Sequence, residues 1–286
     1  MTVRVQLIVT GDLEYLGLHL SLQKLFASTG ADVEFLPPLQ TQDFTSNRVG
    51  ALLPREQATK SLAAKLARSL VSTVYPGRSG TMRADYVIAV DDLELVNADQ
   101  PEHVLEYFRH AVRAYVDSTF SSATAQDRVY QALAEYGSFH LLTPMVESYF
   151  FGEAAALARA GANRAPNRFD MARDLEDFEV DDPAYLAPAP SDAQWKAEPR
   201  HRHPKNYVRY LCDPKGKPLR AYRETHEGLE ALRVLDWSSV LRNEAHAAFA
   251  RALVDDVADA LSVSSPCPGT CSPLTARKGD GLLRNI

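Results

Sequence analysis

Tyr86-Val87-Ile88-Ala89-Val90-Asp91-Asp92-Leu93-Glu94 is the stretch that decides the fold of this chain. Its first five residues are apolar and mostly β-branched or aromatic, which predicts a fully buried strand of a parallel sheet. Three carboxylates follow at once, and ligands of open α/β sheets bind just beyond the carboxyl ends of the strands. Hard oxygen ligands of this kind suit magnesium or manganese. The other reading is that Asp91 and Asp92 only begin the next loop and helix, because Asp is common at helix N-caps.

The composition is that of an ordinary globular protein. The chain has 286 residues, of which 45% are hydrophobic and 24% charged, and its formal net charge is −6. This balance argues against a general nucleic-acid coat but leaves room for a local basic groove. The three cysteines do not suggest a disulfide framework. With a strand-like N-terminus in place of a signal peptide, and without an apolar run of roughly 20 residues, we expect a cytoplasmic protein.

Strand and helix patterns alternate on both sides of this stretch. Strands are predicted at Val3–Thr10, Ala31–Leu36, with Pro37-Pro38 ending it, and Gly137–Leu142. Helical spacing of apolar residues predicts helices after Gly11, over Arg55–Val74, after Pro101, over Asp127–Tyr136 and over Met145–Ala160. The order predicts an α/β fold with a parallel sheet flanked by helices.

Two further acids come directly after predicted strands. Glu14 follows the strand that ends at Thr10, and Glu147 follows the strand that ends at Leu142. Because parallel strands end at one edge of the sheet, both are candidates for the site of Asp91, Asp92 and Glu94. The helix dipole alone also favours an acid in the first turn of a helix, so a purely structural role stays open for each.

Beyond the α/β domain, assigned to residues 1–161, the composition changes twice. Residues 162–199 are acidic and proline-rich and read as an insertion or linker. Residues 200–261 are basic at first and mostly helical, and residues 262–286 have the composition of a disordered tail. The basic run interleaves tyrosines with cations, a mixture that binds nucleic-acid backbone or simply forms a solvated face. Its candidate phosphate contacts are Arg200, Arg202, Lys205 and Arg209.

Three short motifs resemble those of the Toprim fold, which topoisomerases, primases and overcoming-lysogenization-defect nucleases share. They are Val9-Thr10-Gly11-Asp12-Leu13-Glu14, Asp91-Asp92-Leu93-Glu94 and Pro144-Met145-Val146-Glu147. The likeness covers Val3 to about Gly161. It is closest to a Toprim-like family of bacterial proteins often encoded near defence genes. The resemblance implies Mg²⁺ or Mn²⁺ held by Glu14, Asp91, Asp92 and Glu94, with Glu147 supporting catalysis of phosphoryl transfer.

The sequence departs from the family pattern at two places, and these departures leave two functional hypotheses open. Thr10 stands where the family has a Glu, and the family's Asp-x-Asp becomes Asp91-Asp92 or Asp92-x-Glu94. Only residues two apart share a face of a strand, so we expect Asp92 with Glu94, or Asp91 with a neighbour that a turn reorients. One hypothesis is a metal-dependent nuclease acting in phage defence. The other is a catalytically inactive Toprim-like subunit that works with a partner such as an ATPase.

Overall fold

The computed structural model describes residues 2–76, 84–167, 173–187, 199–213, 222–279 and 281–286. Its centre is a four-stranded sheet in the order β2-β1-β3-β4, and every neighbouring pair is parallel. The strands are β1 (Val3–Val9), β2 (Val33–Gln40), β3 (Tyr86–Asp92) and β4 (Gly137–Leu142). The predicted α/β fold with a parallel sheet flanked by helices is confirmed.

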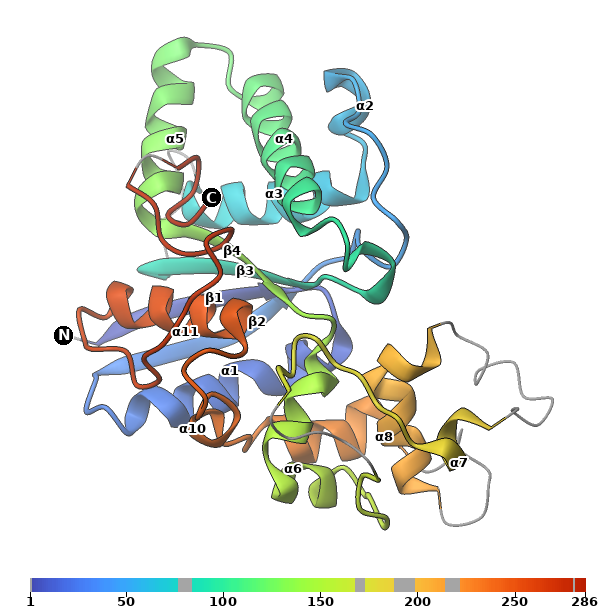
Figure 1. Cartoon of the computed structure of the whole chain (residues 1–286). Helices are drawn as coiled ribbons and strands as arrows, with labels where there is room; N and C mark the ends of the chain where they lie inside the picture. The colour runs from blue at the N-terminus through green and yellow to red at the C-terminus, as the bar shows by residue number, and fades with distance from the viewer. Residues whose placement is uncertain (1, 77–83, 168–172, 188–198, 214–221, 280) are drawn as a thin grey trace.

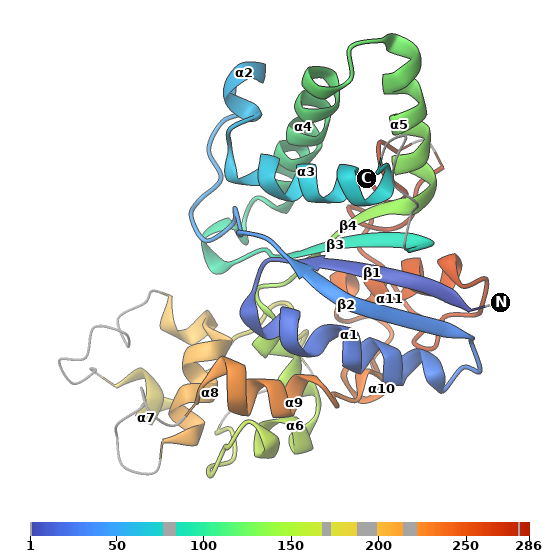
Figure 2. The same cartoon turned by 180° about the vertical axis from the view of Figure 1, so that it is seen from behind.

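Helices cover both faces of the sheet (Figures 1 and 2). Alternation along β3 explains why: Val87 and Ala89 belong to one apolar cluster, and Ile88 and Val90 belong to the other. The first cluster is completed by α3 (Leu62–Val74), α4 (Pro101–Thr119) and α5 (Ala123–Tyr136). The second is completed by α1 (Asp12–Ala27) and by three C-terminal helices, namely α9 (Leu229–Leu232), α10 (Trp237–Val240) and α11 (Ala248–Ala260).

The C-terminal helices therefore share the core of the sheet. Trp237 and Leu253 are buried in the same cluster as Val5 of β1, and the indole nitrogen of Trp237 donates to the hydroxyl of Ser21 on α1 at 3.0 Å. Among the described residues, no helix is both long and apolar enough to cross a membrane.

Three predicted element bounds were wrong for local reasons. β2 continues through Pro37-Pro38, because a shift in register between Gln6 and Ile8 accommodates the prolines on an edge strand. The helix expected over Arg55–Val74 is split into α2 (Arg55–Ala58) and α3, since Ser61 caps the second helix by accepting from the amide of Ala64. The helix expected over Met145–Ala160 is a fully buried 3₁₀ segment, η2 (Val146–Gly152), followed by α6 (Ala154–Arg159).

The described part of residues 162–199 is more than a linker, because its apolar side chains pack in the cluster that the sheet shares with the C-terminal helices. Leu175, Phe178 and Val180 are buried, and α7 (Pro183–Leu186) adds the buried Tyr185. The Glu176 carboxylate accepts from the amides of Phe249 and Ala250 at the start of α11, both at 2.9 Å. Glu176 therefore caps helix α11, a role that the acidic composition of this segment did not suggest.

The expectation of a disordered tail over residues 262–286 is wrong for its described residues. Leu283 and Ile286 are buried, and the side chain of Asn285 pairs with both backbone groups of Phe139 at the free edge of β4. The fully buried Arg251 donates to the carbonyls of Cys267 and Pro268 and so ties the tail to α11. The tail is ordered by residues far away in sequence, such as Phe139, which pairs with Asn285. Such contacts leave no local pattern, so the composition alone suggested disorder.

Candidate functional site

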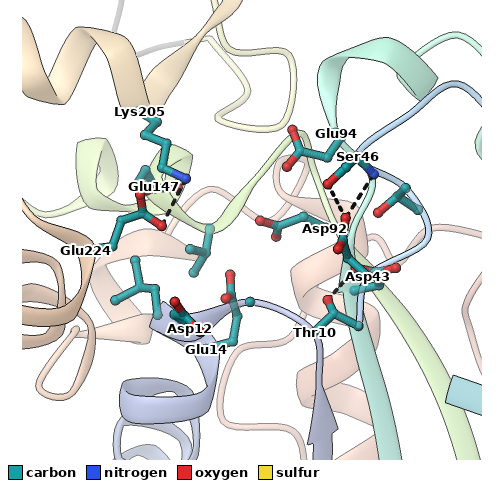
Figure 3. A pocket seen from close by; sticks show the side chains of 15 residues that line it. Thr10, Asp12, Glu14, Asp43, Ser46, Asp92, Glu94, Glu147, Lys205 and Glu224 are labelled. Atoms are coloured by element: carbon teal, nitrogen blue, oxygen red, sulfur yellow. Dashed lines mark hydrogen bonds and ion pairs between the residues drawn. The ribbon is translucent and has the colours of Figure 1, made fainter. Parts of the chain in front are cut away.

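A pocket of about 250 Å³ lies where β1, β3 and β4 end (Figure 3). The α/β core forms its floor and one wall, and the start of α8 (Pro204–Cys212) together with η6 (Glu224–Gly228) forms the other. All five acids predicted from the strand ends line it. Among the described residues, one lysine and eight acids line it, and the acids are Asp12, Glu14, Asp43, Asp91, Asp92, Glu94, Glu147 and Glu224.

Glu14 reaches the pocket because a glycine stands beside it. Gly11 is the N-cap of α1, and a side chain there would place its Cβ 1.9 Å from Oε2 of Glu14. The Glu14 side chain occupies that space and is 5% exposed. Burial raises the pKa of Glu14 to about 8, and the charge of Glu147 adds to the shift.

Asp91 and Asp92 reach the same pocket from opposite faces of β3. Asp91 accepts a hydrogen bond from the hydroxyl of Thr10 at the end of β1, so Thr10 contributes a donor where the Toprim pattern has a carboxylate. Burial raises the pKa of Asp91 to about 7, although the Thr10 hydrogen bond opposes the shift. The pKa of Asp92 lies well above its ordinary value, first because of burial and then because of the charges of Glu14 and Glu94.

Glu94 joins the pocket through an unusual backbone conformation. Its amide donates to the carbonyl of Pro144 at 2.8 Å, which extends the pairing of β3 beyond Asp92, and its φ is 61°. Non-glycine residues seldom adopt a positive φ, and such strain of about 1–3 kcal/mol is common at functional sites. Asp92 and Glu94 line one cavity, as the first expectation has it, and Asp91 lines that cavity as well. Burial raises the pKa of Glu94 to about 7.

Glu147 meets the C-terminal region across the pocket. It lies on η2 with 2% exposure, and it accepts from the hydroxyl of Tyr222 at 3.3 Å. Nζ of Lys205 lies 3.8 Å from Glu147 and 3.0 Å from Glu224 (Figure 3). Burial alone would lower the pKa of Lys205, but the two carboxylates raise it above its ordinary value. Burial raises the pKa of Glu147, and the charge of Lys205 opposes the shift.

The four predicted phosphate contacts have different surroundings. Lys205 faces the acidic pocket, and Arg209 lies 3.6 Å from Glu224. Arg200 donates to the carbonyls of Tyr185 and Ala187. Arg202 lines a separate groove next to the pocket.

The tyrosines of the basic run were expected to be available for stacking on bases, and two of them are not. Tyr207 is fully buried against Phe151 and Phe178, and Tyr222 is 3% exposed. Both side chains belong to the buried cluster shared with the sheet, where their rings pack, and Tyr222 also donates to Glu147.

Sequence patterns missed the loop between β2 and α2, which supplies Asp43, Thr45 and Ser46 to the pocket. The side chain of Asn97, after β3, holds this loop in place, since its amide nitrogen donates to the carbonyl of Thr45 at 2.7 Å and its oxygen accepts from the amide of Val49 at 2.8 Å. The one available signal was length, because a long loop without secondary structure in a compact domain is often functional. Glu224 was missed because nothing local relates it to the strand ends.

Three carboxylate oxygens of the pocket are buried and accept no hydrogen bond from any described residue: Oε1 of Glu14, Oδ2 of Asp91 and Oδ1 of Asp92. Buried acceptors without donors are costly, and a cation would satisfy them. Among the described residues, no three His, Cys, Asp or Glu side chains already form a set of metal ligands. The cavity nevertheless has room for an ion that keeps several of its waters, which is how proteins usually bind Mg²⁺. The donor set and its unpaired oxygens therefore fit a hydrated divalent cation.

Comparison of the chain with protein-family models, with curated proteins and with solved structures found no match. Function must therefore be argued from the pocket itself.

Proposed function

We propose that this protein is a divalent-cation-dependent nuclease that hydrolyses phosphodiester bonds at the strand-end pocket. One observation carries the proposal. Five acids from three strand ends share a cavity in which burial and mutual repulsion raise their pKa values, and three of their oxygens lack a hydrogen-bond donor among the described residues. A cluster of this kind is costly to a fold by itself and becomes favourable when a cation binds.

Glu14, Asp91, Asp92 and Glu94 would hold Mg²⁺ or Mn²⁺, and Glu147 would flank them. A divalent cation bound there would polarise a phosphodiester and neutralise its developing charge. The chain's own residues supply the rest of the arrangement. Lys205 favours the ionised form of Glu147, Thr10 orients Asp91, and the loop anchored by Asn97 closes one side of the cavity.

The resemblance to the Toprim fold supports the same reaction. The first two motifs lie at the carboxyl ends of β1 and β3, the third just after β4, and their acids line one pocket. In the reaction proposed, water adds to phosphorus, the bond from phosphorus to the leaving oxygen breaks, and that oxygen gains a proton. The substrate would be a nucleic acid, in keeping with a role in phage defence.

Thr10 favours a second candidate function. Its hydroxyl donates to Asp91, so one carboxylate oxygen is occupied, and the position holds no acid that could bridge two cations or act as a base. The alternative is a Toprim-like subunit that binds a cation without cleaving and regulates a partner such as an ATPase. The same pocket would serve both functions, so they differ only in cleavage.

Incubation of the purified protein with labelled single- and double-stranded DNA and RNA, in Mg²⁺, Mn²⁺ or EDTA, tests the nuclease. We expect cleavage that needs the cation and is lost in the Asp92→Asn/Glu94→Gln variant. Cation binding without cleavage by the wild type would support the regulatory subunit. Gain of cleavage on Thr10→Glu would then identify the missing carboxylate as the cause. A wild type that neither binds a cation nor cleaves would contradict both functions.

A further inference from the structure

A second hollow, which we call the arginine groove, adjoins the acidic pocket. It has a volume of about 490 Å³ and is lined by Arg48, Leu95, Val96, Ala98, Asp99 and Arg202. The same two chain segments line both hollows, because Ser46 and Glu94 face the pocket while Arg48 and Leu95 face the groove. The two hollows thus lie on either side of the same two segments, so one extended ligand that contacts both segments could occupy both.

The charge of the groove is the opposite of that of the pocket. Arg202 has no acidic partner among the described residues. Arg48 makes two hydrogen bonds to Asp99, both of 2.8 Å, with 57% of the Arg48 side chain and 66% of the Asp99 side chain exposed. Exposed ion pairs contribute little to stability, so a phosphate could replace Asp99 at Arg48 at small cost.

Apolar side chains lie between these cations. Val96 is 42% exposed, and Leu95 and Ala98 line the groove beside it. Their surface would suit the face of a base or a sugar, and that face is accessible in a single strand and hidden by stacking in a duplex.

The wall that carries Arg48 is fixed in place. Asn97 is fully buried, and its side chain accepts from the amide of Val49 and donates to the carbonyls of Thr45 and Asn47. The guanidinium of Arg48 also donates to the carbonyl of Val96 at 2.9 Å. Little ordering of this loop would then be needed on binding, which favours affinity.

We propose that the arginine groove binds the single-stranded part of a nucleic acid whose neighbouring phosphodiester lies in the acidic pocket. Arg202 and Arg48 contact successive phosphates, and a base or sugar rests on Leu95 and Val96. The proposal rests on the nuclease or cation-binding function proposed above, and it names the substrate class as a nucleic acid with a single-stranded segment.

Fluorescence anisotropy with a labelled single-stranded DNA tests the groove independently of the metal. The Asp92→Asn/Glu94→Gln background is used in EDTA over a series of salt concentrations, so that neither a cation nor cleavage takes part. In that background Arg202→Glu should weaken binding about tenfold, which corresponds to the loss of one charge-assisted contact. It should also lower the slope of log Kd against log salt by about 0.7.

Asp99→Asn distinguishes phosphate binding by Arg48 from a purely structural role of the Arg48–Asp99 pair. Removal of that carboxylate frees Arg48, so binding should strengthen about two- to fivefold. Arg113→Glu is the matched control, because Arg113 is a surface arginine on α4 with a 49% exposed side chain that lines neither hollow. It should leave the affinity unchanged.

The proposal for the groove would be overturned if Arg202→Glu had the same affinity and salt slope as the background variant. Weaker binding by Asp99→Asn, or tighter binding of a labelled duplex than of the single strand, would also overturn it. Absence of any binding at low salt would overturn it too. None of these results bears on the acidic pocket, whose own test is stabilisation of the wild type by Mg²⁺ or Mn²⁺.

Discussion

Buried acids differ in their partners between the strand-end pocket and helix α11. At the strand-end pocket, Asp92 has a raised pKa and a buried oxygen without a donor among the described residues. On α11, Asp256 is equally buried, but Nε2 of His140 donates to it at 3.1 Å and Nε of Arg284 at 3.2 Å. Burial opposes ionisation of Asp256, yet the His140 hydrogen bond and the charge of Arg284 hold its pKa below the ordinary value.

The difference supports the cation site proposed for the pocket. The fold supplies Asp256 with partners from β4 and from the tail, so that carboxylate stabilises the protein without a ligand. In the pocket, Thr10 donates to Asp91 and Tyr222 donates to Glu147. Oε1 of Glu14 and Oδ1 of Asp92 are nevertheless buried without a hydrogen-bond donor among the described residues. The remaining charge is left for something from solution, and a divalent cation fits it.

Asp256→Asn should have the largest effect. It removes the fully buried carboxylate that pairs with both His140 and Arg284, so we expect the free energy of unfolding to fall by about 3–5 kcal/mol. Urea unfolding of the variant measures this. Asp259→Asn is the matched control on the same helix, because the Asp259 side chain is 40% exposed and its pairs with Arg277 and Arg284 should contribute less than about 1 kcal/mol. Equal losses in the two variants would erase the contrast between buried and exposed acids.

Asp92→Asn/Glu94→Gln should behave in the opposite way. Without a cation the variant should be as stable as the wild type or more stable, because repelling charge is removed. Mg²⁺ at a hundredfold excess over its dissociation constant should stabilise the wild type by about 2.7 kcal/mol and leave the variant unchanged. Thermal melts with and without the cation measure both quantities. A metal-free variant as damaged as Asp256→Asn would mean that the pocket acids are structural.

The pH dependence of stability should have opposite signs in the two regions. The pKa of Glu14 is raised to about 8 and those of Asp91 and Glu94 to about 7, so the folded metal-free protein binds more protons than the unfolded chain. Its stability should therefore fall as pH rises from about 5 to about 8, by up to about 1.4 kcal/mol per pH unit for each titrating group. Asp256, with a lowered pKa, contributes stability that is lost only as pH falls through that pKa on the acid side.

Saturating Mg²⁺ should remove the part of this decline that comes from the pocket acids, because the cation competes with protons for the same oxygens. Melting temperatures across pH, with Mg²⁺ and with EDTA, give the measurement. A metal-free stability that rises between about pH 5 and 8 would contradict the raised pKa values and, with them, the contrast between the two groups of acids.

Gly11→Ala should have the smallest effect on folding and a selective effect on the pocket. The new Cβ would occupy the place of the Glu14 carboxyl group, and that flexible side chain must move. The backbone at Gly11, with φ −85°, suits alanine, so the free energy of unfolding should change by less than about 1 kcal/mol. Cation affinity, measured from the Mg²⁺ dependence of melting, should weaken severalfold. Gly17→Ala, with a Cβ 3.1 Å from Leu232 on α9, is the control that perturbs α1 away from the pocket.

Much of the α/β core followed from local pattern. The run Tyr86–Val90 is apolar on both faces because helices cover both faces of β3, and that pattern is readable without a structure. The edge of the sheet to which Glu14, Asp91, Asp92, Glu94 and Glu147 belong also followed, since parallel strands end on one side. Whether a cation binds there stays a prediction.

What sequence alone determined, then, is the parallel sheet and the edge at which its acids gather, because both depend on periods of two and of 3.6 residues that local sequence encodes. Only tertiary structure decided that Lys205 and Glu224 close the pocket, that Tyr207 is core, and that the tail supplies Arg284 to Asp256. These contacts join residues that are far apart in sequence, such as Glu147 with Lys205 and Asp256 with Arg284, and no local period of the sequence indicates them. Their cause is the shared core of the sheet and the C-terminal helices, which fixes distant segments side by side and decides which buried charges receive a partner.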